Sequence, residues 1–306
     1  MTKTAWALLA ALSLIWGSSF LLNEIALTAL PPITVVTGRV VFAALTLFVM
    51  LKILGINLPA GRRNWSRLLL LGLFNNAIPF LLIVWGQTMI TSGLASILNG
   101  TTPFFTAFLA HFLVGERLTP ARIGGILLAI AGVGIIFMPS ISLDDLSTGY
   151  GELALLGSSL SYAIAVVISR RSLSGQMKPV QIAFGQLLMS SMIMLPLAFM
   201  VDGLHTMPLP PVDVIAAVLA LALVCGALAY IFYFRLIAAA GATNASLVTL
   251  TIPVVAVLLG ILLLGEPLEA GHLIGMGSIG MGMLMLNGSF SRRRHQVKSL
   301  QPHSSE

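Results

Sequence analysis

The sequence predicts an all-α integral membrane protein of ten transmembrane helices, arranged as two inverted five-helix repeats with the N- and C-termini in the cytoplasm. Three observations support this prediction: composition, the placement of basic residues, and an internal repeat. The 306 residues are 58% hydrophobic and only 8% charged, whereas about a quarter of the residues in soluble domains are charged. A mean hydropathy of +1.01 indicates that lipid, not water, surrounds most of the chain.

Ten apolar runs appear in hydropathy windows of about 19 residues. Each run is longer than the roughly 9 to 11 residues of a tilted barrel strand and lacks its alternation, so we expect helices. The first run exceeds a signal-peptide core, and we expect it to be retained. The predicted spans are residues 5–26, 33–54, 67–88, 92–114, 121–138, 150–170, 179–200, 212–235, 243–264 and 271–289.

Basic residues divide the predicted loops into two classes. With the N-terminus inside, fifteen of the sixteen Lys and Arg residues fall in inner segments, and the outer loops have none. Lys and Arg mark cytoplasmic loops, and one helix too many or too few would reverse the pattern in every later loop. The charges therefore support ten spans with cytoplasmic ends, and only Arg39 lies within a span.

The two halves of the chain repeat at a nearly constant offset. A shift of 147 residues places Arg39 on Gln186. A shift of 150 residues places Ala95-Ser96 on Ala245-Ser246, Pro103 on Pro253, Gly115-Glu116 on Gly265-Glu266, Gly125 on Gly275 and Gly132 on Gly282.

Five helices in each half force the second half to insert upside down. Inverted repeats are typical of secondary transporters, which alternate access to a site near the midplane. We expect a first five-helix repeat over residues 1–140 and an inverted second repeat over 141–290. Residues 291–306 form a basic tail that we expect to be cytoplasmic and disordered.

Several other classes of protein do not fit the residues. The sole cysteine, Cys225, excludes an intrachain disulfide and a Cys-rich metal site. Scattered basic residues argue against nucleic-acid binding. An intramembrane enzyme would need a nucleophile with a base or clustered metal ligands, and a receptor would more often carry a soluble domain. We expect no catalytic residue, no metal and no cofactor. The expected partners are a small-molecule substrate and the lipid bilayer, and a homodimer stays open.

Arg39 is the leading candidate for substrate binding. It lies six residues into a span that begins at the outer surface, roughly 9 Å deep at 1.5 Å per residue. An intramembrane arginine usually faces a cavity or a partner, and here it would hold a substrate carboxylate in a bidentate fork. The alternatives are a structural ion pair with Glu24 or snorkelling to the interface.

Polar residues beside prolines form the second group of candidates. Asn75 and Asn76 precede Pro79, which removes a backbone donor and kinks a helix. Asn99 precedes Pro103, and two threonines precede Pro253 at the corresponding place in the second half. Such paired, interrupted segments point to a binding site, although hydrogen bonds between helices would also explain the amides. We treat Pro103 and Pro253 as structural or gating residues.

Aromatic and amide side chains complete the predicted cavity. Trp16 and Tyr162 occupy corresponding mid-membrane positions, away from the interfacial belt where such rings usually lie. Cavity lining is one reason for this placement and simple packing is the other. The remaining candidates for the cavity wall are Phe80, Tyr230, Gln87 and Gln186.

Two further features have structural interpretations. Glu116 and Glu266 stand at helix ends on opposite membrane faces, where we expect them to pair with loop groups or cap the following helix, with gating as the alternative. Glycine stripes in the fifth and tenth spans predict that these two helices pack closely together, away from the transport path.

The motifs resemble those of the drug/metabolite transporter superfamily, in particular its EamA-type branch of ten-helix carriers. The resemblance covers residues 5–288 and implies export of amino acids or related metabolites across the bacterial inner membrane, although some relatives import. Gln186 in place of Arg39 and Tyr162 in place of Trp16 depart from a symmetric site. The motifs are Trp16-Gly17-Ser18-Ser19-Phe20, Arg39, Pro103, Gly115-Glu116-Arg117-Leu118-Thr119, Pro253 and Gly265-Glu266-Pro267-Leu268.

We therefore expect a secondary transporter that exports amino acids or related carboxylate solutes by alternating access. A multidrug, nucleobase or sugar permease is the alternative. The midplane holds no clear acidic residue. Proton coupling through Glu24 or His111 and facilitated transport both stay open.

Overall fold

The protein folds as a helical bundle in the computed structural model. The structure describes residues 2–116, 118–138, 146–172, 177–241, 245, 247–267 and 269–286. Eight helical segments in this part of the chain are long and apolar enough to cross a membrane, and two further apolar helices, Val248–Leu264 and Ala270–Leu286, are shorter. The protein is therefore an all-helical, multi-pass membrane protein. The predicted tail, 291–306, and the junction of the two predicted repeats at 139–145 lie outside the described residues.

The helices follow one another as the hydropathy pattern predicts. The first half contains α1 (Lys3–Leu27), α2 (Pro32–Ile53), α3 (Arg62–Gly72), η1 (Leu73–Ala77), α4 (Ile78–Gly86), α5 (Ser92–Asn99), α6 (Thr102–Val114) and α7 (Pro120–Phe137). The second half contains α8 (Leu146–Ser172), α9 (Pro179–Leu197), η3 (Ala198–Asp202), η4 (Leu204–Thr206), α10 (Val212–Ala222), η5 (Leu223–Leu228), α11 (Ala229–Ala240), α13 (Val248–Leu259), η6 (Gly260–Leu264) and α14 (Ala270–Leu286).

Two predicted boundaries are wrong. The third span, predicted to begin at residue 67, begins at Arg62, and the eighth, predicted to end at residue 235, runs to Ala240. Hydropathy windows detect only the apolar part of a helix. Backbone hydrogen bonds continue beyond that part into turns of basic and small residues.

The third predicted span is continuous but changes its winding before Pro79. The π-helical turn η1 separates α3 from α4, and its last bond runs from the Ile78 N–H to the Leu73 carbonyl. Proline has no N–H and its ring crowds the carbonyl four residues earlier, and a wider turn relieves this conflict. The widened turn contains Asn75 and Asn76.

The fourth predicted span breaks between α5 and α6 beside Pro103. The missing proline N–H would have bonded to the Asn99 carbonyl. That carbonyl instead accepts hydrogen bonds from the hydroxyls of Thr102, at 2.8 Å, and Ser159, at 3.2 Å. Hydroxyl donors of this kind allow a helix to be interrupted at membrane depth.

The second half has a π-helical turn where the repeat predicts it. η5 covers Leu223–Leu228 and separates α10 from α11. The offset of 150 residues carries the first residue of η1, Leu73, onto the first residue of η5, Leu223. The same shift carries Phe80 onto Tyr230. The two halves therefore widen their backbones at corresponding positions.

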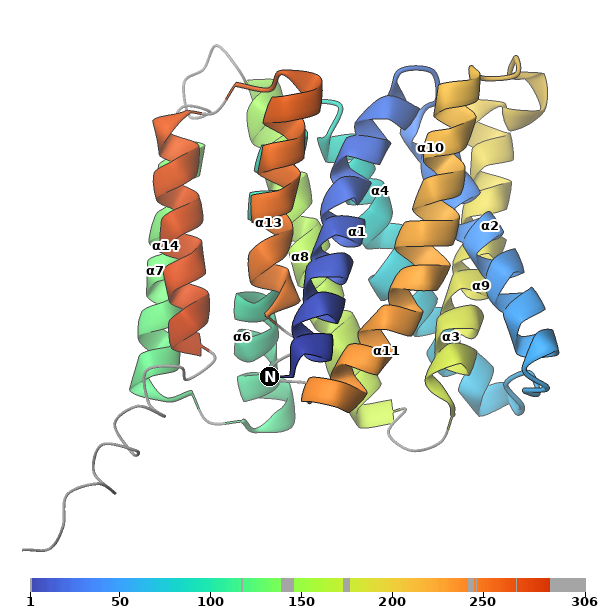
Figure 1. Ribbon diagram of the computed structural model, residues 1–306, viewed down its shortest axis with the longest axis horizontal. Helices are drawn as coiled ribbons and strands as arrows, with labels where there is room; N and C mark the ends of the chain where they lie inside the picture. The colour runs from blue at the N-terminus through green and yellow to red at the C-terminus, as the bar shows by residue number, and fades with distance from the viewer. Residues whose placement is uncertain are drawn as a thin grey trace, which may run out of the picture.

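The helices α7 and α14 pack together at one edge of the bundle, with α2, α3 and α9 at the other (Figure 1). Glycines allow this close approach, as the glycine stripes predict. A Cβ placed on Gly132 would lie 2.9 Å from the Gly275 carbonyl oxygen, and the reverse distance is also 2.9 Å. Neither helix contributes to the central cavity described below.

Candidate binding cavity

A cavity of about 340 Å³ lies inside the bundle, between elements of the two halves. Its walls come from α1, α2, η1, α4, α5 and α6 in the first half, and from α8, α9, η5, α11 and α13 in the second. The predicted site residues that line it are Trp16, Arg39, Asn75, Asn76, Phe80, Asn99, Tyr162, Tyr230 and Pro253. The sequence thus predicted most of the polar and aromatic wall.

Arg39 is the cationic residue of this wall. It is only 7% exposed, and its guanidinium lies 3.9 Å from the centre of the Phe80 ring. Among the described residues, no carboxylate lies within 4 Å of it, and its Nε has no hydrogen-bond partner. The alternative ion pair with Glu24 is not formed. A buried charge without a carboxylate partner among the described residues is costly, and an anionic solute would offset this cost.

Three asparagines bring further unpaired polar atoms to the cavity. Asn76 is fully buried, and neither its Oδ1 nor its Nδ2 has a partner among the described residues. The Oδ1 atoms of Asn23 and Asn99 are also without partners there. All three residues line the cavity. Buried amides without partners are rare in proteins, so these atoms add to the energetic cost of the polar wall.

Gln87 and Gln186 were predicted as candidates for the cavity wall, but neither lies in the wall of the central cavity, and Gln87 lines a second hollow instead. Both side chains are buried behind residues that line the central cavity. Gln186 accepts a hydrogen bond from Asn75 Nδ2 at 3.0 Å and donates from Nε2 to the Tyr230 hydroxyl at 2.8 Å. A long amide can satisfy two neighbours at once, which favours a place between wall residues over a place among them.

Gln87 makes the corresponding connection near the end of α1. Its Oε1 accepts from Asn23 Nδ2 at 2.8 Å, and its Nε2 donates to the Phe20 carbonyl and to Glu24 Oε1, each at 2.9 Å. Asn23 lines the central cavity, whereas Glu24 and Gln87 line a second hollow. The Gln87 amide therefore lies in the partition between the two spaces.

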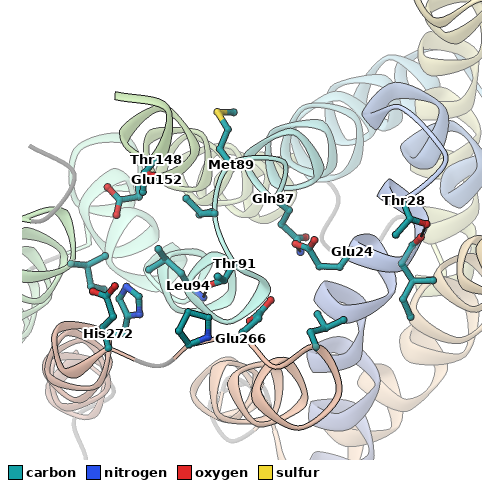
Figure 2. A pocket seen from close by; sticks show the side chains of 16 residues that line it. Glu24, Thr28, Gln87, Met89, Thr91, Leu94, Thr148, Glu152, Glu266 and His272 are labelled. Carbon is teal, nitrogen blue, oxygen red and sulfur yellow. Dashed lines mark hydrogen bonds between the residues drawn. The ribbon is translucent and has the colours of Figure 1, made fainter. Parts of the chain in front are cut away.

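The second hollow, the vestibule, has a volume of about 650 Å³ and opens at the end of the bundle where α1 ends. Figure 2 shows Glu24, Glu152, Glu266 and His272 around it. The vestibule is therefore acidic, in contrast to the central cavity, whose lining contains Arg39 and no carboxylate.

Glu266 caps a helix of the other half. Its two carboxylate oxygens accept from the backbone N–H groups of Ser92 at 2.7 Å and Gly93 at 3.0 Å, in the first turn of α5. The sequence predicted pairing with loop groups or capping of the following helix; the helix that Glu266 caps is α5, and not α14. Gly265, at a φ of 66°, ends η6 in the left-handed conformation and turns the chain toward α5.

Glu116 and Pro103 lie outside the central cavity. Gly115, at a φ of 77°, ends α6 in the same way that Gly265 ends η6. The Glu116 carboxylate lies 3.8 Å from the Arg122 guanidinium near the start of α7, and both side chains are over a third exposed. Pro103 lies in the first turn of α6, where its missing N–H interrupts the fourth span.

Aromatic pairs form two parts of the cavity wall. The rings of Trp16 and Tyr233 are 5.4 Å apart, and those of Tyr162 and Phe80 are 6.5 Å apart. Trp16 Nε1 also donates to the Cys225 carbonyl in η5 at 3.2 Å. Each of these tryptophan and tyrosine rings comes from a helix of one half and faces a partner from the other.

The sequence did not single out Asn23 or Cys225 as wall residues. Asn23 follows Trp16 by seven residues, and Phe20 lies between them at four, so all three share one face of α1. This spacing is the signal that identifies Asn23. Cys225 carries no such signal, because its place in the wall depends on the π-helical turn.

A multi-pass helical bundle around an internal cavity lined by a cation, amides and aromatic rings is typical of membrane transport proteins. The chain belongs to the EamA-like transporter family, whose model matches residues 3–138 and again residues 149–288. The chain is similar to an uncharacterized transporter of Archaeoglobus fulgidus, with 26% identity over 92% of this chain and 98% of that protein. It is also similar to a probable terminal-alkyne amino-acid exporter of Streptantibioticus cattleyicolor, with 24% identity over 98% of each.

The fold also matches a solved crystal structure. The TM-score is 0.66 with 18% sequence identity, over 97% of this chain and 100% of that one. At this identity the match shows the fold alone.

Proposed function

We propose that the protein is a secondary transporter that exports amino acids or related carboxylate solutes across a bacterial inner membrane by alternating access. The observation that carries this proposal is Arg39, a buried guanidinium that faces an internal cavity without a carboxylate partner among the described residues. A solute carboxylate would supply the missing charge and two hydrogen-bond acceptors in a fork geometry.

The remaining wall favours a solute that also carries a donor group. The amide side chains of Asn23, Asn75 and Asn99 line the cavity, and amide oxygens accept hydrogen bonds of the kind that an ammonium group donates. The wall contains no carboxylate, so a cationic drug would meet Arg39 without a counter-charge. These features favour a zwitterionic amino acid over the multidrug alternative. The name of the Streptantibioticus relative agrees with this choice.

The proposed topology has ten spans in two inverted repeats, 1–140 and 141–290, with cytoplasmic ends. Glycine contacts between α7 and α14 support a two-fold relation between the halves. Gly125 faces Gly282 and Gly132 faces Gly275, whereas the sequence repeat pairs Gly125 with Gly275 and Gly132 with Gly282. Exchange of partners in this way is what a two-fold axis produces.

Charge supports the proposed orientation. α1, α3 and α7 begin at the end of the bundle marked N in Figure 1, and Lys3, Arg62 and Arg122 lie in their first turns. The acidic vestibule lies at the opposite end. The positive-inside rule then assigns the basic end to the cytoplasm and the vestibule to the outside.

Solute counterflow in proteoliposomes tests the function. Purified protein is assayed with labelled L-amino acids and monocarboxylates, and Arg39→Ala and Arg39→Lys are compared with Arg235→Ala, which removes an exposed arginine outside the cavity. We expect saturable exchange that Arg39→Ala abolishes, Arg39→Lys weakens and Arg235→Ala preserves, with normal thermal unfolding. Absence of exchange for every carboxylate solute, or full activity of Arg39→Ala, would overturn the proposal.

A further inference from the structure

Gln186 connects two residues of the cavity wall without lining the cavity. It is 3% exposed and lies on α9 between η1 and α11. Its Oε1 accepts from Asn75, so its Nε2 must face the Tyr230 hydroxyl. An amide has a carbonyl on one side and an NH₂ on the other, and the Asn75 bond therefore fixes which group Tyr230 meets.

The direction of the hydrogen bonds from Asn75 to Gln186 and from Gln186 to Tyr230 determines whether the Tyr230 hydroxyl donates or accepts in the cavity. The Tyr230 oxygen accepts from Gln186, so its own hydrogen is left for another acceptor. The Asn75 amide also lies within hydrogen-bonding reach of this hydroxyl, and the Tyr230 ring lines the cavity beside it. The bond from Gln186 turns the hydroxyl hydrogen away from α9 and favours Tyr230 as a donor toward a solute in the cavity.

The donor and the cation belong to the wall of the same cavity, because Arg39 and Tyr230 both line it. Phe80, whose ring is in cation–π contact with the Arg39 guanidinium, packs against the same hydrophobic cluster as Tyr230. A carboxylate has about four acceptor positions on two oxygens, more than one guanidinium edge uses. A hydroxyl donor in the same cavity wall suits one of the remaining positions.

We propose that Gln186 is a positioning residue, which holds Tyr230 as a hydrogen-bond donor to the solute carboxylate bound by Arg39. This inference rests on the proposed function and deepens it. It also gives the departure from sequence symmetry a reason. Arg39 and Gln186 are equivalent in the repeat, yet one acts as the charge and the other orients a neutral donor in the same cavity wall.

A double-mutant cycle tests the inference. Gln186→Met, which keeps the length of the side chain without its hydrogen bonds, is combined with Tyr230→Phe. The probe is the L-amino acid that the unmodified protein exchanges best, and the half-saturation concentration and the maximal counterflow rate are measured separately. Ser191→Ala is the matched control on α9, because the Ser191 hydroxyl bonds only to the Leu187 carbonyl of its own helix.

We expect each single variant to raise the half-saturation concentration by about tenfold, the usual scale for one hydrogen bond to a charged group. The double variant should be no worse than Tyr230→Phe alone, because Gln186 acts only through that hydroxyl. The carboxamide analogue of the same amino acid is a neutral and weaker acceptor, so its binding should differ less between the variants. Ser191→Ala should retain the original half-saturation concentration.

Two results would overturn the inference while leaving the proposed function intact. If the effects of the two variants multiply, Gln186 acts independently of Tyr230. If Gln186→Met lowers only the maximal rate and the thermal stability, its role is packing. Absence of amino-acid exchange by the unmodified protein would instead overturn the proposed function and this inference together.

Discussion

Gly125 and Gly282 face each other so closely that a Cβ on either would lie 2.5 Å from the carbonyl oxygen of the other. This contact joins α7 to α14, the last helices of the two halves. Backbone atoms, not side-chain tips, form the barrier, so a methyl group cannot be accommodated by a change of rotamer. The two helices must separate or tilt instead.

Gly125→Ala should destabilise the protein by about 1–3 kcal/mol, the usual cost of overpacking. Gly134→Ala on the same helix is the control, because nothing lies within 4 Å of its added Cβ. That variant should be neutral or slightly stabilising, since glycine weakens a helix interior. Thermal unfolding in detergent distinguishes the two. Equal unfolding temperatures would show that the α7–α14 contact contributes little.

Glu266→Ala should also lower stability, by about 0.5–2 kcal/mol, because it removes the acceptors that cap α5. Glu269→Ala is a suitable control, since Glu269 is exposed in the same loop. Loss of the cap should loosen the first turn of α5, which hydrogen exchange at Ser92 and Gly93 can detect. Unchanged protection at these amides would contradict the capping role.

Phe80→Leu should weaken solute binding even though the variant retains Arg39. The ring holds the guanidinium at 3.9 Å, and a cation–π contact of this kind contributes about 0.5–2 kcal/mol. We expect the half-saturation concentration in counterflow to rise by several fold. Phe48→Leu removes the ring next to Lys52, a pair outside the cavity, and should leave binding unchanged. Similar half-saturation concentrations for both variants would show that Phe80 does not contribute to solute binding.

Gln87→Ala should open the partition between the vestibule and the central cavity, because three hydrogen bonds across it are lost. Cys225, the only cysteine, lines the cavity and reports on this change. A membrane-impermeant maleimide added from the vestibule side should label Cys225 faster in Gln87→Ala than in the unmodified protein.

A permeant maleimide should label both proteins at similar rates. Thr88→Ala provides the control, since the Thr88 hydroxyl donates only to the nearby Trp85 carbonyl. Cys225→Ala should give no labelling at all. Equal labelling of Gln87→Ala and the unmodified protein by the impermeant reagent would mean that Gln87 does not seal the partition.

Much of the helix pattern, and most of the cavity wall, could be predicted from the sequence. Apolar runs define helices directly, and an intramembrane arginine such as Arg39 is too costly to face lipid. The predicted asparagines, tryptophan and tyrosines lie in the cavity wall because polar groups within spans turn away from lipid.

The errors concern residues whose role depends on a partner. Gln87 and Gln186 are polar within spans, as wall residues are, but pattern alone cannot tell a group that faces a cavity from one that braces its neighbour. The partner of Glu266 was missed because α5 is distant in sequence from the glutamate that caps it. Such contacts require knowledge of which helices meet at their ends.

The π-helical turns η1 and η5 give each half a means of changing its cavity surface. Each holds one residue more per turn than an α-helix needs. If the extra residue of the π-helical turn moves along the helix by one position, the residue that returns to the α-helical winding rotates by about 100° around the helix axis. Both ends of the helix stay in place. Asn75 and Cys225 lie at equivalent positions in these turns. Such a shift of the π-helical turn would replace one side chain in the cavity wall by its neighbour, with little movement of the surrounding helices.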